Sequence, residues 1–196
     1  LHSAVEIDGR SSARIETEGL AARTFGARLE PGPTRVSIRQ AQDASGQWLL
    51  ATQDGYVASH GVLHERRIFV EARGAEVRGE DILSVPDARA QAQHDRASRD
   101  GPLDFAVRFH LSPEVGAEYD PVRQLVTLTL PSGEVWMFRA AGGVIGLEDT
   151  VVFDPASAAP IPSRQVVVRA DLVEYLGQVI WSFGRAAEAP APAEVS

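Results

Sequence analysis

The histidines are the side chains of this sequence whose types and spacing could support acid-base or metal chemistry, and the chain has 5 of them. His60 and His64 are separated by an even number of positions, so on a β-strand both side chains would point to one face. Together with a carboxylate such as Asp54, such a pair could bind a metal ion, because imidazole and carboxylate are both zinc ligands. Histidine pairs are also common as structural groups, so the spacing alone leaves both interpretations open.

A further histidine, His110, lies on a segment in which apolar and polar residues alternate clearly. Within residues 105–111 the large apolar side chains Phe105, Val107, Phe109 and Leu111 fall on one face of a predicted strand, and Ala106 falls on the other. The first face belongs to the core, whereas Arg108 and His110 point the other way, toward solvent or a cleft. His110 could contact a substrate there, and a merely solvated or hydrogen-bonded histidine is the alternative.

The charge balance limits the classes of partner. A formal net charge of -8 disfavours nucleic acids and anionic membranes, both of which favour a basic surface. The basic residues are all arginine, whose guanidinium binds carboxylate or sulfate at two points, so Arg66 and Arg67 could meet an acidic sugar. A codon preference explains the arginines equally well. The absence of cysteine excludes disulfides and thiolate metal sites, and no apolar run reaches the ~20 residues that a membrane-spanning helix needs.

Short alternating runs bounded by Gly and Pro predict the elements that must position these residues. Many short strands without a βαβ rhythm indicate an all-β fold, an antiparallel β-sandwich of stacked sheets. We expect one domain over residues 1–184 and a disordered Ala/Pro/Glu tail over 185–196. The predicted strands cover residues 5–8, 35–40, 48–52, 62–73, 76–83, 105–111, 125–130, 135–140, 144–153, 165–169 and 179–183. The turn at 131–134 should join two of them in a hairpin.

Some stretches and residues do not follow that pattern. Residues 86–102 are polar and Ala-rich, and they predict mainly a long loop with at most one helical turn at 88–93. His94, within that loop, should have no specific role. Trp48, Trp136 and Trp181 lie in strand patterns, which favours packing in the core over stacking on sugars.

The sequence as a whole resembles the C-terminal part of heparinase II/III-like polysaccharide lyases, over most of residues 1–184. No single phrase is diagnostic, but the order and spacing of several phrases together are fairly specific. They cover residues 2–9, 54–56, 61–67, 78–83, 105–111, 133–139, 142–151 and 180–183.

The resemblance implies a bacterial enzyme in which a helical α/α toroid is followed by a β-sandwich, with the substrate cleft between them. Such enzymes cleave acidic, uronate-containing polysaccharides of the heparin, heparan sulfate or alginate kind by β-elimination, in the periplasm or cell envelope. A base removes the proton at C5 of the uronate, and an acid protonates the departing glycosidic oxygen. A positioned acid or base supplies ~10²- to 10⁴-fold of rate, so we expect this module to be inactive without the toroid of the same protein.

The site residues follow from the same resemblance. His2 matches the histidine that projects from the sandwich into the cleft and assists the elimination, although Ala4 stands where the family commonly has Thr. We assign catalysis to His2, and substrate binding to Tyr56, Arg67 and His110.

A metal ion is a further property of some family members. A histidine often precedes their Asp-Gly-Tyr phrase, whereas here Gln53 precedes Asp54. We therefore predict no cofactor and no metal, and retain His64 alone as a candidate zinc ligand.

Other functions remain open on the sequence. A non-catalytic carbohydrate-binding or scaffold sandwich would keep the fold without the chemistry, and fold-level analogy does not distinguish the two. A structural or oligomerisation domain is a third possibility, which would present a broad apolar patch on one face.

Overall fold

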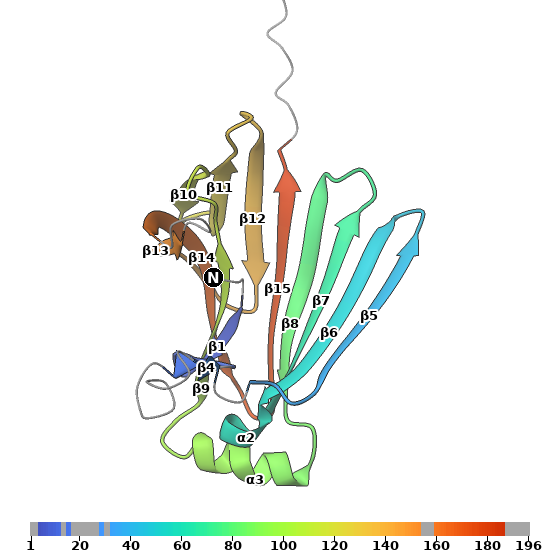
Figure 1. Cartoon of the computed structure of the whole chain (residues 1–196), viewed down its shortest axis with the longest axis vertical. Helices are drawn as coiled ribbons and strands as arrows, with labels where there is room; N and C mark the ends of the chain where they lie inside the picture. Colours follow the sequence, from blue (N-terminus) through green and yellow to red (C-terminus); the bar gives the residue numbers. More distant parts are fainter. Residues whose placement is uncertain (1–3, 13–14, 17–27, 30–31, 154–158, 187–196) are drawn as a thin grey trace, which may run out of the picture.

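The computed structural model describes residues 4–12, 15–16, 28–29, 32–153 and 159–186, which form mainly two stacked antiparallel sheets (Figure 1). The first has five strands, in the order β13 (Val144–Phe153), β14 (Pro160–Leu172), β9 (Leu103–His110), β1 (Val5–Ile7) and β2 (Arg10–Ser11). The second has eight, in the order β10 (Gly116–Asp120), β11 (Leu125–Thr129), β12 (Val135–Ala141), β15 (Leu176–Arg185), β8 (Glu76–Ser84), β7 (Val62–Glu71), β6 (Gly46–Tyr56) and β5 (Val36–Asp43). A small third sheet pairs β3 (Ile15–Glu16) with β4 (Arg28–Leu29).

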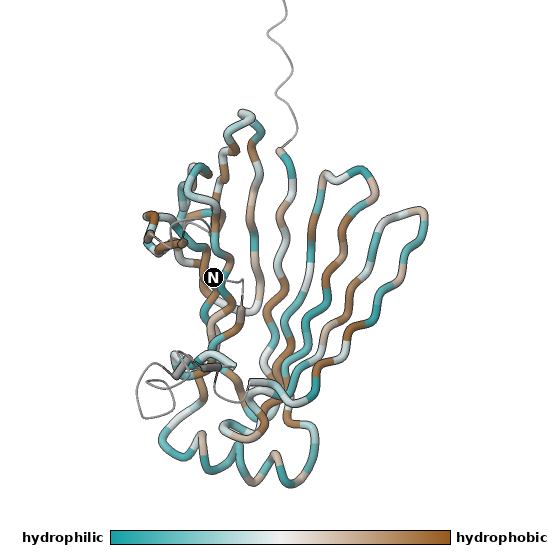
Figure 2. The backbone as a smooth tube through the Cα atoms, in the orientation of Figure 1, coloured by the Kyte–Doolittle hydropathy of each residue, from teal (hydrophilic) through white to brown (hydrophobic). Residues whose placement is uncertain are grey.

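The core lies between the two sheets, and the all-β sandwich predicted from the alternation is confirmed. Figure 2 shows hydrophobic positions alternating with hydrophilic ones along many strands. On β9 the predicted inward residues Phe105 and Phe109 are buried. The Phe109 ring packs at centroid distances of 5.2 Å from Phe138 on β12 and 4.9 Å from Trp181 on β15. Aromatic contacts therefore join the two sheets.

The predicted hairpin is also confirmed. β11 and β12 pair in the register Val126↔Phe138, and the backbone N–H of Gly133 in the turn donates to Leu130 O at 2.9 Å. Gly133 has a φ of 87°, which glycine adopts without a side-chain penalty. The next strand of this sheet along the chain is β15, which lies between β12 and β8.

The prediction that residues 86–102 form mainly a loop is wrong, because helix α3 occupies Ala88–Ala97. The carboxylate of Asp87 accepts the backbone N–H of Ala90 at 2.8 Å and so caps the first turn. Alanine has the highest helix propensity, and the helix buries a narrow stripe that includes Ala90 and His94. His94, expected to have no specific role, is thus a buried residue of the helix at 3% exposure.

The prediction that His60 and His64 share a strand face is wrong as well. His60 lies in a short helix, α2 (Val57–His60), which ends at Gly61 with a φ of 70°. A Cβ at Gly61 would lie 2.1 Å from the carbonyl oxygen of Ala90, so glycine is needed for the close packing of α2 on α3. His64 follows on β7 and belongs to a different element.

The tryptophan predictions have mixed outcomes. Trp181 is buried as predicted, whereas Trp48 is 43% exposed beside the Phe69 ring, at a centroid distance of 4.4 Å. The predicted tail lies outside the described residues except for Arg185, which ends β15, and Ala186, whose N–H donates to Val135 O. Neither helix in the described ranges is long and apolar enough to cross a membrane.

Candidate functional site

The predicted catalytic residue, His2, lies outside the described residues, which begin at Ala4. The structure shows how the strand that follows it is held. The carbonyl of Ala4 accepts the backbone N–H of Arg108 at 2.9 Å, and β1 then pairs with β9 in the register Val5↔Val107. The start of β1 is therefore fixed against the centre of the five-stranded sheet.

Tyr56 holds the same point from the other sheet. Its hydroxyl donates a hydrogen bond to the carbonyl of Val5, and its side chain is 1% exposed. Burial raises the pKa of the Tyr56 hydroxyl, so the group remains a donor throughout the physiological range. A side chain this deeply buried offers no surface to a polysaccharide. The structure thus places Tyr56, predicted as a substrate-binding residue, where it positions β1.

The bulge in β6 just before Tyr56 requires a residue without a side chain at position 55. The register between β6 and β7 shifts between Gln53 and Tyr56, which marks a bulge. Within it, a Cβ at Gly55 would lie 2.9 Å from both the Cβ and the carbonyl oxygen of Ser12, next to β2. Glycine at position 55 therefore allows the segment after β1 to lie against the end of β6.

A buried polar network lies on the inner face of the eight-stranded sheet, centred on Asp81. Asp81 is fully buried and accepts hydrogen bonds from His64 Nε2 at 2.7 Å, Arg66 Nε at 2.7 Å and Trp181 Nε1 at 2.9 Å. Burial alone would raise the pKa of Asp81, but the His64 hydrogen bond and the Arg66 charge together lower it. Asp81 is therefore an ionised carboxylate that is neutralised by Arg66.

The protonation of His64 follows from its neighbours. Gln53 Oε1 accepts the backbone N–H of Gly55 at 2.7 Å, so the amide nitrogen of Gln53 faces His64 Nδ1 at 3.3 Å. Nδ1 is then the acceptor, and the proton lies on Nε2, which donates to Asp81. With both ring nitrogens engaged, His64 stabilises the bulge instead of transferring protons.

These residues do not fit a zinc ion. A zinc site needs His64 and Asp81 as open donors, whereas here both are hydrogen-bonded and the Arg66 guanidinium lies against the carboxylate. The other ring nitrogen of His64 faces the side-chain amide of Gln53, which is not a usual zinc ligand. Among the described residues, no three His, Cys, Asp or Glu side chains are grouped so that they could hold a metal.

The other two predicted substrate-binding residues lie on different surfaces. Arg67 points to the outer face of the eight-stranded sheet, where its guanidinium pairs with Glu65 at 2.6 Å and Glu80 at 2.8 Å. His110 is half-buried on the outer face of the five-stranded sheet, two residues from Arg108. The structure therefore does not bring Tyr56, Arg67 and His110 together.

Arg108 instead centres a second polar network. Its guanidinium pairs with Glu6 of β1 at 2.6 Å and with Glu148 of β13 at 2.9 Å, and Gln165 donates to Glu148 at 3.1 Å. Arg169 also pairs with Glu148. The network cross-links the strands of the five-stranded sheet and adds a further tie to β1.

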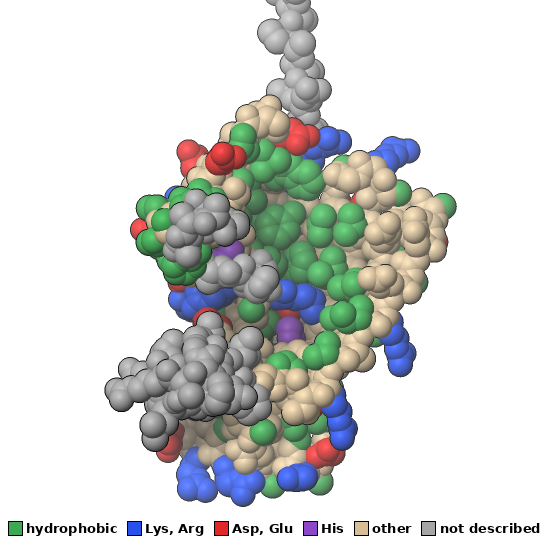
Figure 3. Space-filling view, in the orientation of Figure 1, with side chains coloured by type: hydrophobic (Ala, Val, Ile, Leu, Met, Phe, Trp, Pro, Cys, Tyr) green, Lys and Arg blue, Asp and Glu red, His purple; other side chains and the backbone are tan. Residues whose placement is uncertain are grey.

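A hollow lies in one face of the molecule (Figure 3). Hydrophobic side chains form its upper wall, and basic and histidine side chains lie at its centre, between the two sheets. Two polar networks lie on either side of β1, one around Asp81 and one around Arg108, and the groups of each network are paired within it. In the part of the chain that the structure describes, the two networks support the start of β1 and the neighbouring strands.

Sequence reasoning missed Asp81 and Gln53 as the partners of His64, and Trp181 as a further partner of Asp81. One signal was available: Asp81 shares the parity of Val77 and Leu83 on its strand, so it is an acid on an inward apolar face. The contact between Asp81 and Trp181 joins residues 100 positions apart, and no local pattern indicates it.

Comparisons with known proteins agree with the fold. The family model described as "Heparinase II/III-like, C-terminal" matches residues 1–182. FtsZ-localized protein C of Caulobacter vibrioides (strain NA1000 / CB15N) is 31% identical over 179 residues, which cover 89% of this chain and 30% of that protein.

Two solved structures are similar in fold. The heparan sulfate lyase HepC from Pedobacter heparinus superimposes with a TM-score of 0.66 at 11% identity, over 97% of this chain and 25% of that chain. A crystal structure of heparinase III gives a TM-score of 0.65 at 10% identity, over 96% and 24%. The chain thus spans under a third of the length of each of these relatives.

Proposed function

The chain belongs to the heparinase II/III-like C-terminal family, and on that premise we propose that it is the β-sandwich module of a longer polysaccharide lyase. The substrate is an acidic, uronate-containing polysaccharide of the heparin, heparan sulfate or alginate kind, cleaved by β-elimination. The fold shared with a heparan sulfate lyase and with heparinase III supports this proposal. An α/α toroid preceding the module in the same protein completes the cleft, in the periplasm or cell envelope.

The anchoring of β1 is the observation that carries the proposal. The Ala4 carbonyl accepts a hydrogen bond from the Arg108 backbone, and the Val5 carbonyl accepts one from the Tyr56 hydroxyl. The Glu6 carboxylate pairs with the Arg108 guanidinium. Three consecutive residues are thus fixed from two sheets, and the first of them is two positions after His2 in the sequence. A catalytic group must be held close to its productive geometry, and a rigid strand next to it supplies that support.

His2 then acts at the module's side of the cleft, where its imidazole stabilises charge on the uronate or the leaving group. The C5 base and the remaining acid-base groups come from the toroid. His64 is not one of them, because both its ring nitrogens are engaged. The module alone therefore has no elimination activity.

A non-catalytic scaffold or carbohydrate-binding role is the second candidate. It is favoured by the relative that is 31% identical, a protein named for its localisation with FtsZ, whereas the two lyases above are 10% and 11% identical. Under this candidate the same anchored sandwich binds a partner or a glycan without turnover.

The experiment compares the full-length protein with the 196-residue chain on heparin, heparan sulfate and alginate, following the unsaturated uronate product. We expect product from the full-length protein alone. Product from the chain would contradict the assignment of the base to another domain. Full-length protein that binds a polymer but yields no product would replace the lyase proposal with the second candidate.

A further inference from the structure

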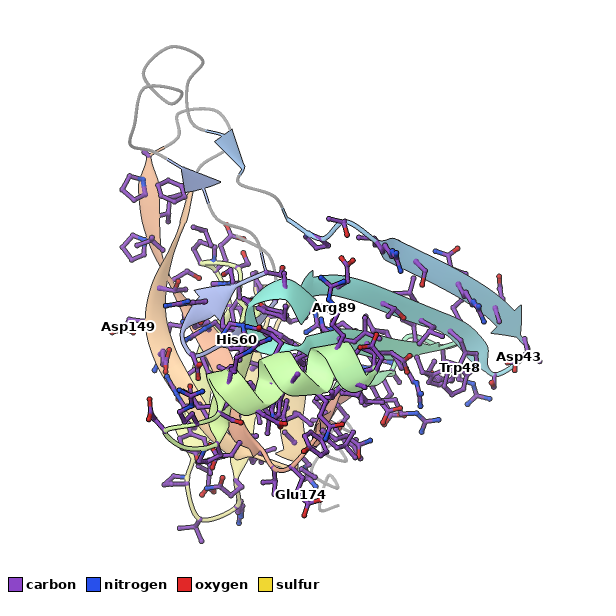
Figure 4. All side chains as sticks on the ribbon, turned by 90° about the horizontal axis from the view of Figure 1, so that it is seen from below. Asp43, Trp48, His60, Arg89, Asp149 and Glu174 are labelled. Carbon is purple, nitrogen blue, oxygen red and sulfur yellow. The ribbon has the colours of Figure 1, made fainter. Side chains whose placement is uncertain are left out.

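A groove of about 1030 Å³ lies between helix α3, the first residues of β5 and the last residues of β6. Thr52 and Leu63 line it, and they point to the opposite sheet face from Gln53 and His64. Figure 4 shows the labelled Arg89 between α3 and the neighbouring strands. The groove is therefore separate from the hollow on the inner face.

Three arginines line this groove: Arg35 beside β5, and Arg89 and Arg96 on α3. Many arginines of the sheets, such as Arg67 and Arg108, form ion pairs with carboxylates. None of the three groove arginines pairs with a carboxylate in the part of the chain that the structure describes. Among these described residues no carboxylate therefore competes with an added anion for the three guanidinium groups, although Arg96 also donates to Gln93.

The acidic residues of the groove already accept hydrogen bonds from neighbouring groups. Asp54 accepts the backbone N–H of Arg35 at 2.9 Å and both the hydroxyl and the N–H of Thr34 at 2.7 Å, and these bonds keep its pKa low. Asp87 caps Ala90 at the start of α3. Each carboxylate is oriented toward main-chain donors, so neither is drawn into an ion pair with the groove arginines.

The helix sets the spacing of its arginines. Arg89, Gln93 and Arg96 stand at helical positions i, i+4 and i+7, which form one stripe, so the two arginines are about 10 Å apart along the axis. Gln93 donates to Ser59 O at 2.8 Å and accepts Arg96 at 3.1 Å, so Arg96 is held in place. One small anion does not span that distance, whereas a chain with repeated anionic groups does.

We propose that this groove is a second, non-catalytic binding site for an acidic polysaccharide chain, with Arg35, Arg89 and Arg96 contacting successive carboxylate or sulfate groups. The choice of polymer rests on the proposed function. Guanidinium groups suit this ligand because they bind carboxylate and sulfate at two points. The site would hold the polymer on the outer face while the cleft engages another part of the same chain, which raises the local concentration of substrate.

The test is isothermal titration of the 196-residue chain with a heparan sulfate octasaccharide, at low and at high salt. We expect the Arg89→Gln/Arg96→Gln double variant to weaken binding about tenfold or more, and Arg35→Gln to weaken it to a smaller extent. The double variant should also reduce the salt dependence, since fewer charge contacts are made. Arg73→Gln/Arg123→Gln is the matched control, because both side chains are exposed in turns and the net charge changes equally.

Equal loss of affinity in the control pair would overturn the proposal, because general charge would then explain the binding. A single-stranded DNA oligonucleotide of equal charge that competes as tightly as the octasaccharide would overturn the assignment to a polysaccharide. Binding is measured here without turnover, so failure of the full-length protein to form unsaturated product would remove the lyase proposal and leave the groove standing.

Discussion

The hydroxyl of Tyr56, at the end of β6, donates its hydrogen bond to the carbonyl of Val5 in β1, and so joins the eight-stranded sheet to the five-stranded one. Val5 is 3% exposed, so no bulk water replaces this donor. The Asp-Gly-Tyr phrase therefore has a structural meaning: Gly55 makes room for Ser12, and Tyr56 fixes the strand that follows His2.

Replacing Tyr56 with Phe should leave the Val5 carbonyl buried without its partner. We expect the free energy of unfolding to fall by about 1–3 kcal/mol, the usual range for such a loss. Urea unfolding measures it, with Tyr119→Phe as the control, since the Tyr119 hydroxyl accepts only an exposed glutamine in a turn. Equal effects of the two substitutions would show that the contact with Val5 contributes nothing special.

Replacing Asp81 with Asn removes the charge that neutralises Arg66, whose side chain is only 15% exposed. Breaking a buried pair in this way costs about 3–5 kcal/mol. The matched control is Glu80→Gln on the outer face, where the partner Arg67 is 52% exposed and a change of about 0–1 kcal/mol is expected. A thermal midpoint for Asp81→Asn that equals the control's would contradict the network.

The stability should depend on pH through His60. Burial lowers the pKa of His60 below its ordinary 6.5, against the opposing effect of Asp8. The unfolded chain then binds the proton more readily, so the contribution of His60 is complete above about pH 6.5 and is lost as the pH falls toward its lowered pKa. We expect the urea unfolding midpoint to fall as the pH is lowered from about 7.5 to about 5, roughly the range in which histidine titrates. The midpoint of the His60→Gln variant should fall less. Parallel profiles would contradict this.

Zinc should not stabilise the chain. A metal that binds the native state raises its thermal midpoint in proportion to occupancy, and the donors around His64 are already engaged. We expect the same midpoint with added zinc and with a chelator. An upward shift that the chelator reverses, and that His64→Gln abolishes, would show that the hydrogen-bonded network opens to admit the ion.

His2→Ala in the full-length protein should impair chemistry and leave folding intact. Loss of one positioned acid-base or electrostatic group costs on the order of 10²-fold in turnover, whereas an ordinary surface substitution changes stability by no more than ~0.5 kcal/mol. The rate of unsaturated-product formation and the thermal midpoint are measured together. Unchanged turnover would remove His2 from the site, and a matching collapse of the midpoint would make its role structural.

Local patterns in the sequence predicted much of the sandwich. The alternation in residues 105–111 gave the inward face of β9, and the turn at 131–134 gave the β11–β12 hairpin. Helix α3 was not predicted because the polar composition of residues 86–102 is typical of a loop, although their alanines favour a helix. The helix packs on the protein through a single buried stripe that includes Ala90 and His94. The prediction for Trp48 was wrong because β6 lies next to the edge strand β5, where an aromatic side chain on the outer face stays partly exposed.

The site was less accessible from sequence. The family resemblance is confirmed, but family phrases do not say which way a side chain faces. Arg66 and Arg67 were considered together, yet alternation sends Arg66 to Asp81 inside and Arg67 to Glu80 outside. The partners of His64 depend on the pairing of β7 with β8 and with β6, and the register of these pairings is not encoded in any short window of sequence.

The place of β15 in the larger sheet has a consequence for biosynthesis. β15 pairs with β12 on one side and β8 on the other, so without it the sheet is divided into two unjoined blocks. During synthesis the two blocks cannot join until residues 176–185 have left the ribosome. Until then the edges of β8 and β12 are exposed to solvent, as are the aromatic side chains that later contact Trp181. Strand pairing that is late and long-range in sequence slows folding and leaves unpaired strand edges that can aggregate. We therefore expect the sandwich to need protection from aggregation during synthesis until its last strand, β15, has paired.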